Sequence, residues 1–215
     1  MNNADPEQLA QQVRHRSLRV RIMLFPEVEI LDFAGPYEVF SVASRVAQRD
    51  GLLPHPAFVV EAVSGSRSTV SARHGLGMVP DVDFDDAAAA DVLIVPGGVV
   101  AQPLNDPASL GWLQRACSEA GIVASVCTGA FLLARIGLLT NQRVTTHWED
   151  IPGLRSAYPE LDVVESVPFV DLGNLLTSAG ISAGIDMSLH LVGRILGPKA
   201  AKATARQMQY AWEDS

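Results

Sequence analysis

One cysteine stands where a thiol could act as a nucleophile. Cys127 directly follows the apolar run 122–126 and precedes Thr128 and Gly129. Such a run followed by small residues predicts a buried strand that turns sharply into a helix. A thiol at that turn lies beside the unpaired amides that begin the helix, and these stabilise an anion. The sequence therefore predicts that the pKa of Cys127 is depressed and that its side chain is largely a nucleophilic thiolate.

Two glycines close another apolar stretch in a similar way. The segment 91–95 is followed by Pro96, Gly97 and Gly98. Glycine allows a close approach of the backbone and leaves its N–H accessible, so both amides could stabilise negative charge that develops in a reaction. An ordinary turn after a strand would use the same residues. Their chemical role therefore depends on whether they lie beside Cys127.

The other residues with reactive or ligating side chains do not form a metal motif. Cys117 lies inside an amphipathic segment and is expected to be a small buried apolar residue. The five histidines are scattered, and neither CxxC nor HExxH occurs. Asp186 and His190, four residues apart on a predicted helix, are expected to pair on its surface. No metal and no organic cofactor is expected.

The elements that must position these residues alternate between strands and helices. Strands are predicted at 18–25, 57–64, 91–95, 122–126, 143–148, 162–166, 168–173 and 174–180, and helices at 36–47, 106–121, 128–137, 150–159, 181–197 and 199–212. Pro36 suits the first turn of its helix, and Gly173 suits a hairpin turn. Apolar strands that alternate with amphipathic helices predict an α/β fold, with a mainly parallel sheet covered on both faces. Sites in such sheets lie at the carboxyl ends of strands, where Cys127 and the two glycines fall.

Length and charge restrict the class of protein. The 215 residues suit a single domain over 18–215, preceded by a polar arm over 1–17 that can be helical in its second half. The formal net charge of -8 argues against binding to nucleic acid or to an anionic membrane surface. No apolar stretch reaches the roughly 18 residues of a membrane span, and no secretory signal begins the chain. A soluble, cytoplasmic protein is expected.

Several motifs together resemble the ThiJ/PfpI superfamily, the class I glutamine amidotransferase-like group. They are "FPEVEILDFAGPYEV", "VPGG", "VASVCTGAFLLARIGLLTNQRVTTHW" and "TSAGISAGIDMSLHLV", and the resemblance covers about residues 18–212. The series is most similar to the isocyanide hydratase branch, and also to the N-terminal domains of certain AraC-type regulators. The resemblance implies a flavodoxin-like three-layer sandwich, Cys127 at a nucleophile elbow, a small-molecule substrate and a homodimer.

The resemblance also implies a partner for the cysteine. Asp32 falls where the family carries an acidic residue that is hydrogen-bonded to the thiol. A carboxyl held against a thiolate must be protonated to donate, so a raised pKa and a role in proton transfer are expected of Asp32. Without the resemblance, Asp32 would be interpreted as a turn or N-cap carboxylate before the helix at 36. Glu27 lies nearby in the sequence and could be mistaken for the partner.

Other positions matched by the resemblance are expected around the pocket. Thr128 is expected in the catalytic set; it occupies the position where protease-like relatives often carry a histidine, so a Cys–His dyad of that kind is not expected. His147 is either a polar neighbour of the cysteine or an ordinary histidine near a strand end. Gly180 and Ile181, which precede a long helix, are expected to border the pocket.

The leading functional hypothesis is a cysteine-dependent hydro-lyase that converts an isocyanide to an N-substituted formamide. One alternative is a glyoxalase- or deglycase-like enzyme acting on oxoaldehydes. Another is a ligand- or redox-sensing domain without catalysis. The chain lacks the helix-turn-helix region that follows this domain in the regulators, which disfavours a regulator. It also lacks the Pro-rich segment that generally follows the last helix of isocyanide hydratases.

Overall fold

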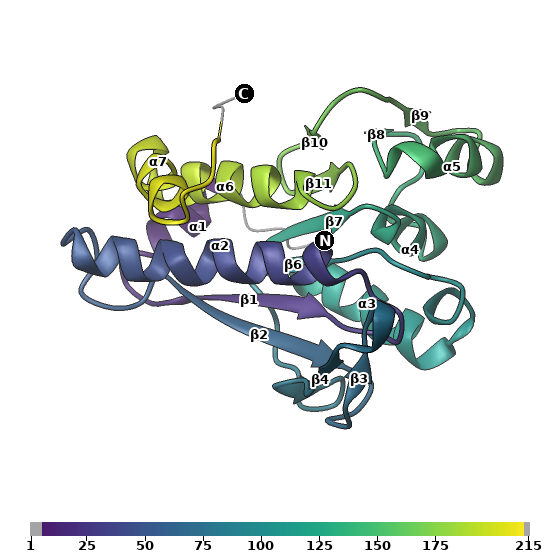
Figure 1. Ribbon diagram of the computed structural model, residues 1–215, viewed down its shortest axis with the longest axis horizontal. Helices are drawn as coiled ribbons and strands as arrows, with labels where there is room; N and C mark the ends of the chain where they lie inside the picture. The colour runs from purple at the N-terminus through teal and green to yellow at the C-terminus, as the bar shows by residue number, and fades with distance from the viewer. Residues whose placement is uncertain (1–5, 213–215) are drawn as a thin grey trace.

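A seven-stranded sheet forms the centre of the protein in the computed structural model, which describes residues 6–212 (Figure 1). Neighbouring strands of this sheet are parallel except for the antiparallel pair at one edge. In spatial order they are β10 (Phe169–Asp171), β11 (Leu175–Ser178), β7 (Ile122–Val126), β6 (Val92–Val95), β1 (Leu18–Met23), β2 (Phe58–Ser64) and β5 (Val82–Asp83). Strands β6 and β7 are fully buried, as the apolar runs predicted.

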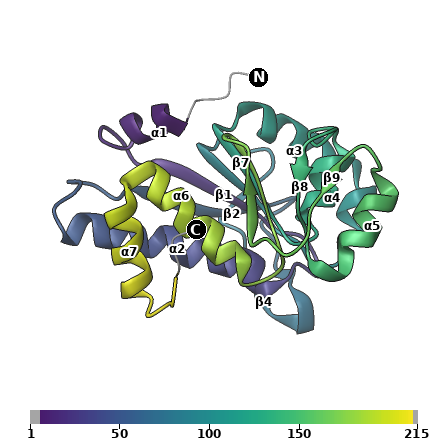
Figure 2. The same ribbon diagram turned by 90° about the horizontal axis from the view of Figure 1, so that it is seen from above.

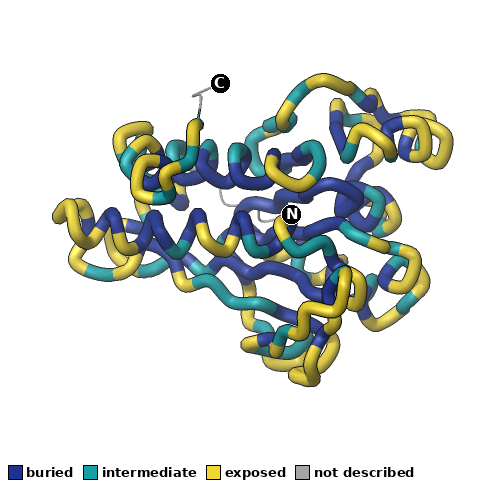
Figure 3. Tube along the Cα trace, in the orientation of Figure 1, coloured by how far each residue is buried: buried dark blue, intermediate teal, exposed yellow. Residues whose placement is uncertain are grey.

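Helices cover both faces of this sheet and confirm the predicted α/β, flavodoxin-like sandwich. Figure 2 shows one group on one side and the other group on the opposite side. The first group is α1 (Pro6–Gln12), α2 (Ile30–Arg49), α6 (Ala183–Leu196) and α7 (Pro198–Gln207), and the second is α3 (Pro107–Glu119), α4 (Gly129–Arg135) and α5 (Ile151–Ala157). The buried residues are concentrated in the central strands and in the helix faces that pack on them (Figure 3). None of the described helices is long and apolar enough to cross a membrane.

The N-terminal segment contributes to the core. A polar arm was expected over 1–17, with a helix in its second half. Helix α1 begins earlier, at Pro6, and ends at Gln12. Residues 1–5 lie outside the described part. Leu9 and Val13 are buried, and α1 packs against α6. The two apolar side chains therefore join this segment to the sheet-covering helices.

Helix α2 begins earlier than the sequence pattern predicted. It starts at Ile30, not at Pro36, so that Pro36 lies inside the helix and Asp32 lies in its first turn. An interior proline removes one backbone hydrogen bond and costs about 3 kcal/mol, and for this reason it suggested a helix start. Burial of the α2 face that includes Phe33 and Pro36 offsets this cost. Gly35 allows this face to pack closely on α6, because a side chain at this position would come within 2.9 Å of Ile185.

Several local signals are confirmed, and other predicted elements are shorter in the structure, among them the strand expected over 162–166, which is reduced to two residues. Asp106 caps α3 by accepting from the N–H groups of Ala108 and Ser109, and Gly173 turns the β10–β11 hairpin with φ of 93°. The strand predicted over 143–148 is reduced to β8 (Arg143–Val144), which pairs outside the main sheet with β9 (Asp162–Val163). The last helix ends at Gln207, short of residue 212. The remaining short elements are β3 (Val70–Ser71), β4 (Gly77–Met78) and the 3₁₀ turns η1 (Arg73–Gly75), η2 (Pro103–Asn105) and η3 (Trp148–Asp150).

Candidate active site

Cys127 occupies a strained turn between β7 and α4. Its φ of 56° lies in the left-handed region, which costs a non-glycine residue about 1–3 kcal/mol. Thr128 follows, and α4 begins at Gly129. A side chain at Gly129 would come within 2.1 Å of the carbonyl oxygen of Val95, so only glycine allows the helix to start this close to β6. The predicted elbow is present, and packing on both sides holds it in place.

Asp32 is brought from the first turn of α2 to this elbow. Its side chain is fully buried, and Oδ2 accepts a hydrogen bond from the N–H of Gly97 at 3.0 Å. The Cys127 thiol and the N–H of Ile181 also lie close enough to stabilise the charged carboxylate. The other oxygen, Oδ1, is buried without a hydrogen bond of good geometry to any described residue. One oxygen is thus fixed by the backbone, and the other is available for proton transfer.

The pKa of Asp32 is raised to about 7, as the sequence analysis expected. Burial is the largest cause, because it penalises the charged form. The negative charge of Glu29 raises the pKa further, and the hydrogen bonds from Gly97, Cys127 and Ile181 oppose the rise. A carboxyl with this pKa can both give and accept a proton near neutral pH.

The predicted depression of the Cys127 pKa is wrong in sign. Burial is again the largest cause and raises the pKa of the thiol above its usual value, and the charge of Asp32 raises it further. Hydrogen bonds from the backbone and side chain of Thr128 lower it without offsetting these effects. Cys127 is only 7% exposed, and the loss of hydration of its sulfur outweighs the stabilisation by the amides that begin α4. Cys127 is therefore a neutral thiol at rest, and its ionisation is coupled to the proton on Asp32.

Thr128 and the two glycines hold the turn after β7 against the loop after β6. The hydroxyl of Thr128 accepts from the N–H of Gly98 at 2.9 Å and donates to the carbonyl oxygen of Gly98 at 2.9 Å. A side chain at Gly97 would come within 2.5 Å of the Thr128 amide nitrogen and within 2.9 Å of Asp32 Oδ2. The glycines are required because the chain passes too close for any side chain.

Glu27 contacts the loop after β6 through its backbone. Its side chain is exposed, whereas its carbonyl oxygen accepts from the N–H of Val99 at 3.0 Å. Gly98 also forms an isolated bridge with Val28. The carboxylate that reaches Cys127 is that of Asp32, and Glu27 is not its partner.

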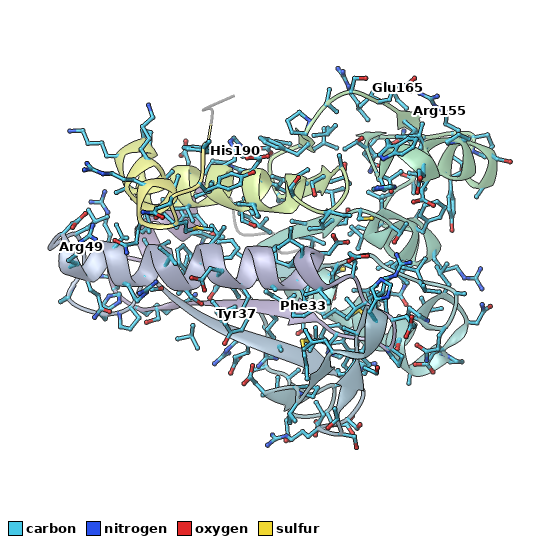
Figure 4. The ribbon with its side chains drawn as sticks, viewed as in Figure 1. Phe33, Tyr37, Arg49, Arg155, Glu165 and His190 are labelled. Carbon is cyan, nitrogen blue, oxygen red and sulfur yellow. The ribbon has the colours of Figure 1, made fainter. Side chains whose placement is uncertain are left out.

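A cavity of about 440 Å³ opens beside these residues. His147, Gly180, Ile181 and Glu165 are among the residues that line it. Figure 4 shows Glu165 close to Arg155 of α5. Cys127 is not a lining residue, but two neighbours connect it with the cavity. Thr146 lines the cavity and donates to the Cys127 carbonyl oxygen, and Ile181 lines it while its N–H acts on Asp32.

His147 belongs to the wall of the cavity. A side chain at Gly180 would come within 2.0 Å of its ring, so the imidazole packs directly on that glycine. Its Nδ1 accepts weakly from the N–H of Glu149 at 3.4 Å and lies 3.5 Å from Asp150 Oδ2. The charged neighbours that shift the pKa of Cys127 are Asp32 and Asp150, and His147 is not among them. His147 is therefore better placed to shape the pocket than to act as a base on the sulfur.

The expected pairing of Asp186 with His190 does not occur, because each side chain has a partner from another element. His190 Nε2 lies 2.7 Å from Asp171 Oδ2 on β10, and Tyr210 donates to Asp186 at 3.1 Å. Figure 4 shows His190 on α6. Tertiary contacts thus replace the local helix pair. Within residues 6–212, no group of three or more His, Cys, Asp or Glu side chains could hold a metal ion.

The sequence analysis missed the residues that hold the backbone of the elbow. Thr146 donates to the Cys127 carbonyl oxygen at 2.8 Å, and Thr177 accepts from the N–H of Thr145 at 2.9 Å. The N–H of Cys127 is directed to the carbonyl oxygens of Ser178 and Ala179. Two consecutive threonines before a histidine were the available signal. Both residues are 1% exposed, so their hydroxyls must find partners within the fold.

Comparison with known sequences finds a matching family and several similar proteins. The model of the DJ-1/PfpI family matches residues 18–194. An isonitrile hydratase of Pseudomonas putida is 35% identical over 198 residues, which cover 91% of this chain and 79% of the relative. The HTH-type transcriptional regulator GbdR of Pseudomonas aeruginosa is 29% identical over 191 residues. The match covers 89% of this chain but only 50% of the regulator, so the chain spans about half the length of that relative.

Solved structures show the same fold. A THiJ/PfpI family protein from Pseudomonas syringae has a TM-score of 0.80 at 22% identity, covering 94% of this chain and 78% of the other. DJ-1beta of Drosophila melanogaster has a TM-score of 0.75 at 19% identity, covering 92% and 100%. The strained cysteine turn, the buried carboxyl beside it and these matches lead to one conclusion: the chain belongs to the DJ-1/PfpI family.

Proposed function

We propose that this protein hydrates an isocyanide to an N-substituted formamide, with Cys127 as the nucleophile. The observation that carries the proposal is the pair formed by Cys127 and Asp32, a thiol at a strained turn beside a buried carboxyl whose pKa is about 7. The similarity to an isonitrile hydratase supports the choice of substrate. Thr128 and the Gly97 amide support the pair by fixing its geometry.

The proposed reaction has two stages. In the first, the Cys127 sulfur bonds to the terminal carbon of R–N≡C, while the thiol proton passes through Asp32 to that carbon. The product is the thioimidate R–N=CH–S–Cys127. In the second, water adds to the same carbon and a proton reaches the nitrogen through Asp32. The C–S bond then breaks, the thiol is restored, and R–NH–CHO leaves.

The raised pKa values fit this sequence of proton transfers. Since the thiol is neutral at rest, attack requires a base, and ionised Asp32 can accept the proton as the sulfur bonds to carbon. Protonated Asp32 no longer carries the charge that raises the pKa of Cys127. The same carboxyl then holds the proton that the carbon or nitrogen needs.

The surroundings of the site favour an apolar substituent on the substrate. Leu31, Val99, Trp148 and Ile181 are each 37–73% exposed, and each stands next to a site residue in the chain. Leu31 lies in the first turn of α2 and Trp148 begins η3, while Val99 follows β6 and Ile181 precedes α6. Exposed apolar side chains around a small site gain free energy when a substrate covers them.

The test measures formamide from a panel of alkyl and aryl isocyanides by chromatography. Wild type is expected to produce formamide. Cys127→Ala is expected to lose activity to the background level, whereas Cys117→Ala, which alters a buried cysteine inside α3, is expected to retain it. Turnover that persists in Cys127→Ala would refute the mechanism.

The same preparations should be assayed with methylglyoxal, with lactate as the product measured. Lactate production that depends on Cys127, without formamide production, would replace the proposal by a glyoxalase-like activity. If neither product forms, a sensing role related to that of the regulators is favoured. Mass spectrometry after mild peroxide would then show whether Cys127 oxidises before Cys117.

We also propose that the active form is a homodimer. The resemblance to the ThiJ/PfpI superfamily, which implies a homodimer, supports this. Light scattering after gel filtration should give twice the mass of the chain, and a monomer at micromolar concentration would contradict this.

A further inference from the structure

A second, smaller cavity lies away from Cys127, between the sheet and α3. Its volume is about 200 Å³, and its lining comes from β1, β6, α3 and the segment 84–90. Figure 2 shows α3 on the opposite side of the sheet from α2 and α6. This cavity and the cavity beside Cys127 have no lining residue in common.

The floor of this cavity contains a buried arginine. Arg21, on the central strand β1, is 3% exposed. Its Nε donates to Glu61 at 3.2 Å, and its Nη1 donates to the carbonyl oxygen of Ala88. Among the described residues, Nη2 has no hydrogen-bond partner, and it is not sealed inside the protein. Since Arg21 lines the cavity, a ligand there can accept a hydrogen bond from this nitrogen.

The carboxylate that faces Arg21 is shared between two arginines. Arg19 and Arg21 both lie 3.2 Å from the same oxygen of Glu61, so a single carboxylate faces two guanidinium groups. The Arg19 Nε is itself buried without a well-formed hydrogen bond to the described residues. This leaves an excess positive charge under the cavity, which favours an anionic ligand.

A third arginine and two carboxylates stand at the entrance. Arg115, on α3, lines the cavity, is exposed, and has no ion pair with another described residue. Asp85 and Glu119 also line it, but both are exposed to water. Water screens these two negative charges and the charge of Arg115 alike, whereas the charge of Arg21 is buried and screened much less. The deepest part of the cavity is thus its most positive part.

The remaining lining residues have apolar side chains and leave space between them. Phe84 and Trp112 stack with ring centroids 4.4 Å apart, and both line the cavity. The run 87–90 consists of alanines, which let its carbonyl groups approach the arginines without filling the space. At about 30 Å³ for each water molecule, the volume holds roughly seven waters, or one small organic acid.

We propose that this cavity binds a small monocarboxylate. The carboxylate would accept hydrogen bonds from Arg21 Nη2 and from Arg115, and the hydrocarbon part would pack on Phe84 and Trp112. Guanidinium matches a planar carboxylate in a two-bonded geometry, and the aromatic wall suits a flat apolar body. The site is separate from the proposed hydratase reaction and does not depend on it.

Isothermal titration of the full chain with benzoate tests the proposal. Benzoate is expected to bind, while benzyl alcohol, which has the same body without the charge, is not. Arg21→Met and Arg115→Gln should each weaken binding by about tenfold or more, the usual effect of losing a charge-assisted hydrogen bond. Arg45→Gln, an exposed arginine on α2, and Cys127→Ala should not change it.

The outcomes separate the proposal from nonspecific binding. Because Arg21 is buried, its variant requires a check of folding by circular dichroism; Arg115 is exposed, so its variant tests the site even if Arg21→Met unfolds. Absence of benzoate binding would overturn the proposal, as would equal binding by all four variants. Inorganic phosphate that binds as tightly as benzoate would also overturn it, because a general anion site has no use for the aromatic wall.

Discussion

The Asp32 carboxylate accepts a hydrogen bond from the backbone N–H of Gly97 at 3.0 Å, although 65 residues separate the two in the chain. This bond joins the start of α2 to the loop after β6. It also fixes one oxygen of the carboxyl that acts on Cys127. A backbone amide of a distant loop therefore helps to hold the acid beside the thiol.

Replacing Asp32 with Asn should separate catalysis from stability. The amide oxygen can still accept from Gly97, but the group no longer transfers protons, so formamide production should fall by about 100-fold or more. At high pH, the same substitution should make the folded protein more stable. The pKa of Asp32 is about 7 in the fold against an ordinary value of 3.8, so the folded state holds this proton more tightly than the unfolded chain.

Stability of the wild type should therefore fall as pH rises between about 4 and 7, on the order of 4 kcal/mol in total from this group. Asp32→Asn should lack this loss and be the more stable protein at pH 8. Urea unfolding of both proteins at pH 4 and pH 8 measures the free energy of unfolding. A difference between the two proteins that is the same at both pH values would contradict the assigned pKa.

The reactivity of Cys127 should depend on Asp32. Because the carboxylate charge helps to raise the pKa of the thiol, Asp32→Asn should move the pH profile of alkylation by iodoacetamide to lower pH. The rate is measured by mass spectrometry in a Cys117→Ala background. Asp186→Asn, which alters a carboxylate bound to Tyr210, serves as the control and should leave the profile unchanged. A profile that does not move in Asp32→Asn would show that the two groups are not coupled.

Replacing Gly97 with Ala should damage both the site and the fold. The new methyl group would lie 2.5 Å from Thr128 and 2.9 Å from Asp32 Oδ2, which forces the loops apart. We expect a loss of about 1–3 kcal/mol in stability and a large loss of formamide production. In Gly111→Ala the nearest atom is 3.8 Å away, inside α3, and stability should rise by about 0.5–1 kcal/mol. Thermal unfolding distinguishes them, and equal melting temperatures would be the contrary result.

Thr146 should act as a positioning residue through the Cys127 backbone. In Thr146→Val the hydroxyl that donates to the Cys127 carbonyl oxygen is lost while the shape is kept. We expect kcat for formamide production to fall by about tenfold with little change in KM. Thr204→Val removes a comparable buried hydroxyl, bonded at 2.8 Å to Ala200 on α7, and should cost similar stability without loss of kcat. If both variants lose kcat equally, the effect is one of stability.

The sequence determined the features that depend on near neighbours in the chain. The fully apolar runs 92–95 and 122–126 formed the buried strands β6 and β7. The Cys-Thr-Gly series formed the elbow, and Asp106 capped α3 through amides two and three residues away. In each of these cases, backbone conformation and side-chain period act over a few residues, and both can be read locally.

Only the tertiary structure decided where the start of α2 lies and how the charged groups behave. Pro36 indicated a helix start, but burial of the α2 face extended the helix back to Ile30 and carried Asp32 into the site. The pKa of Cys127 rose because packing removed its water, a term that no local pattern contains. His190 bonded to Asp171 and not to Asp186, and Arg21 was enclosed beneath α3. Desolvation and pairing depend on which distant segments meet, and that is set only when the whole chain has folded.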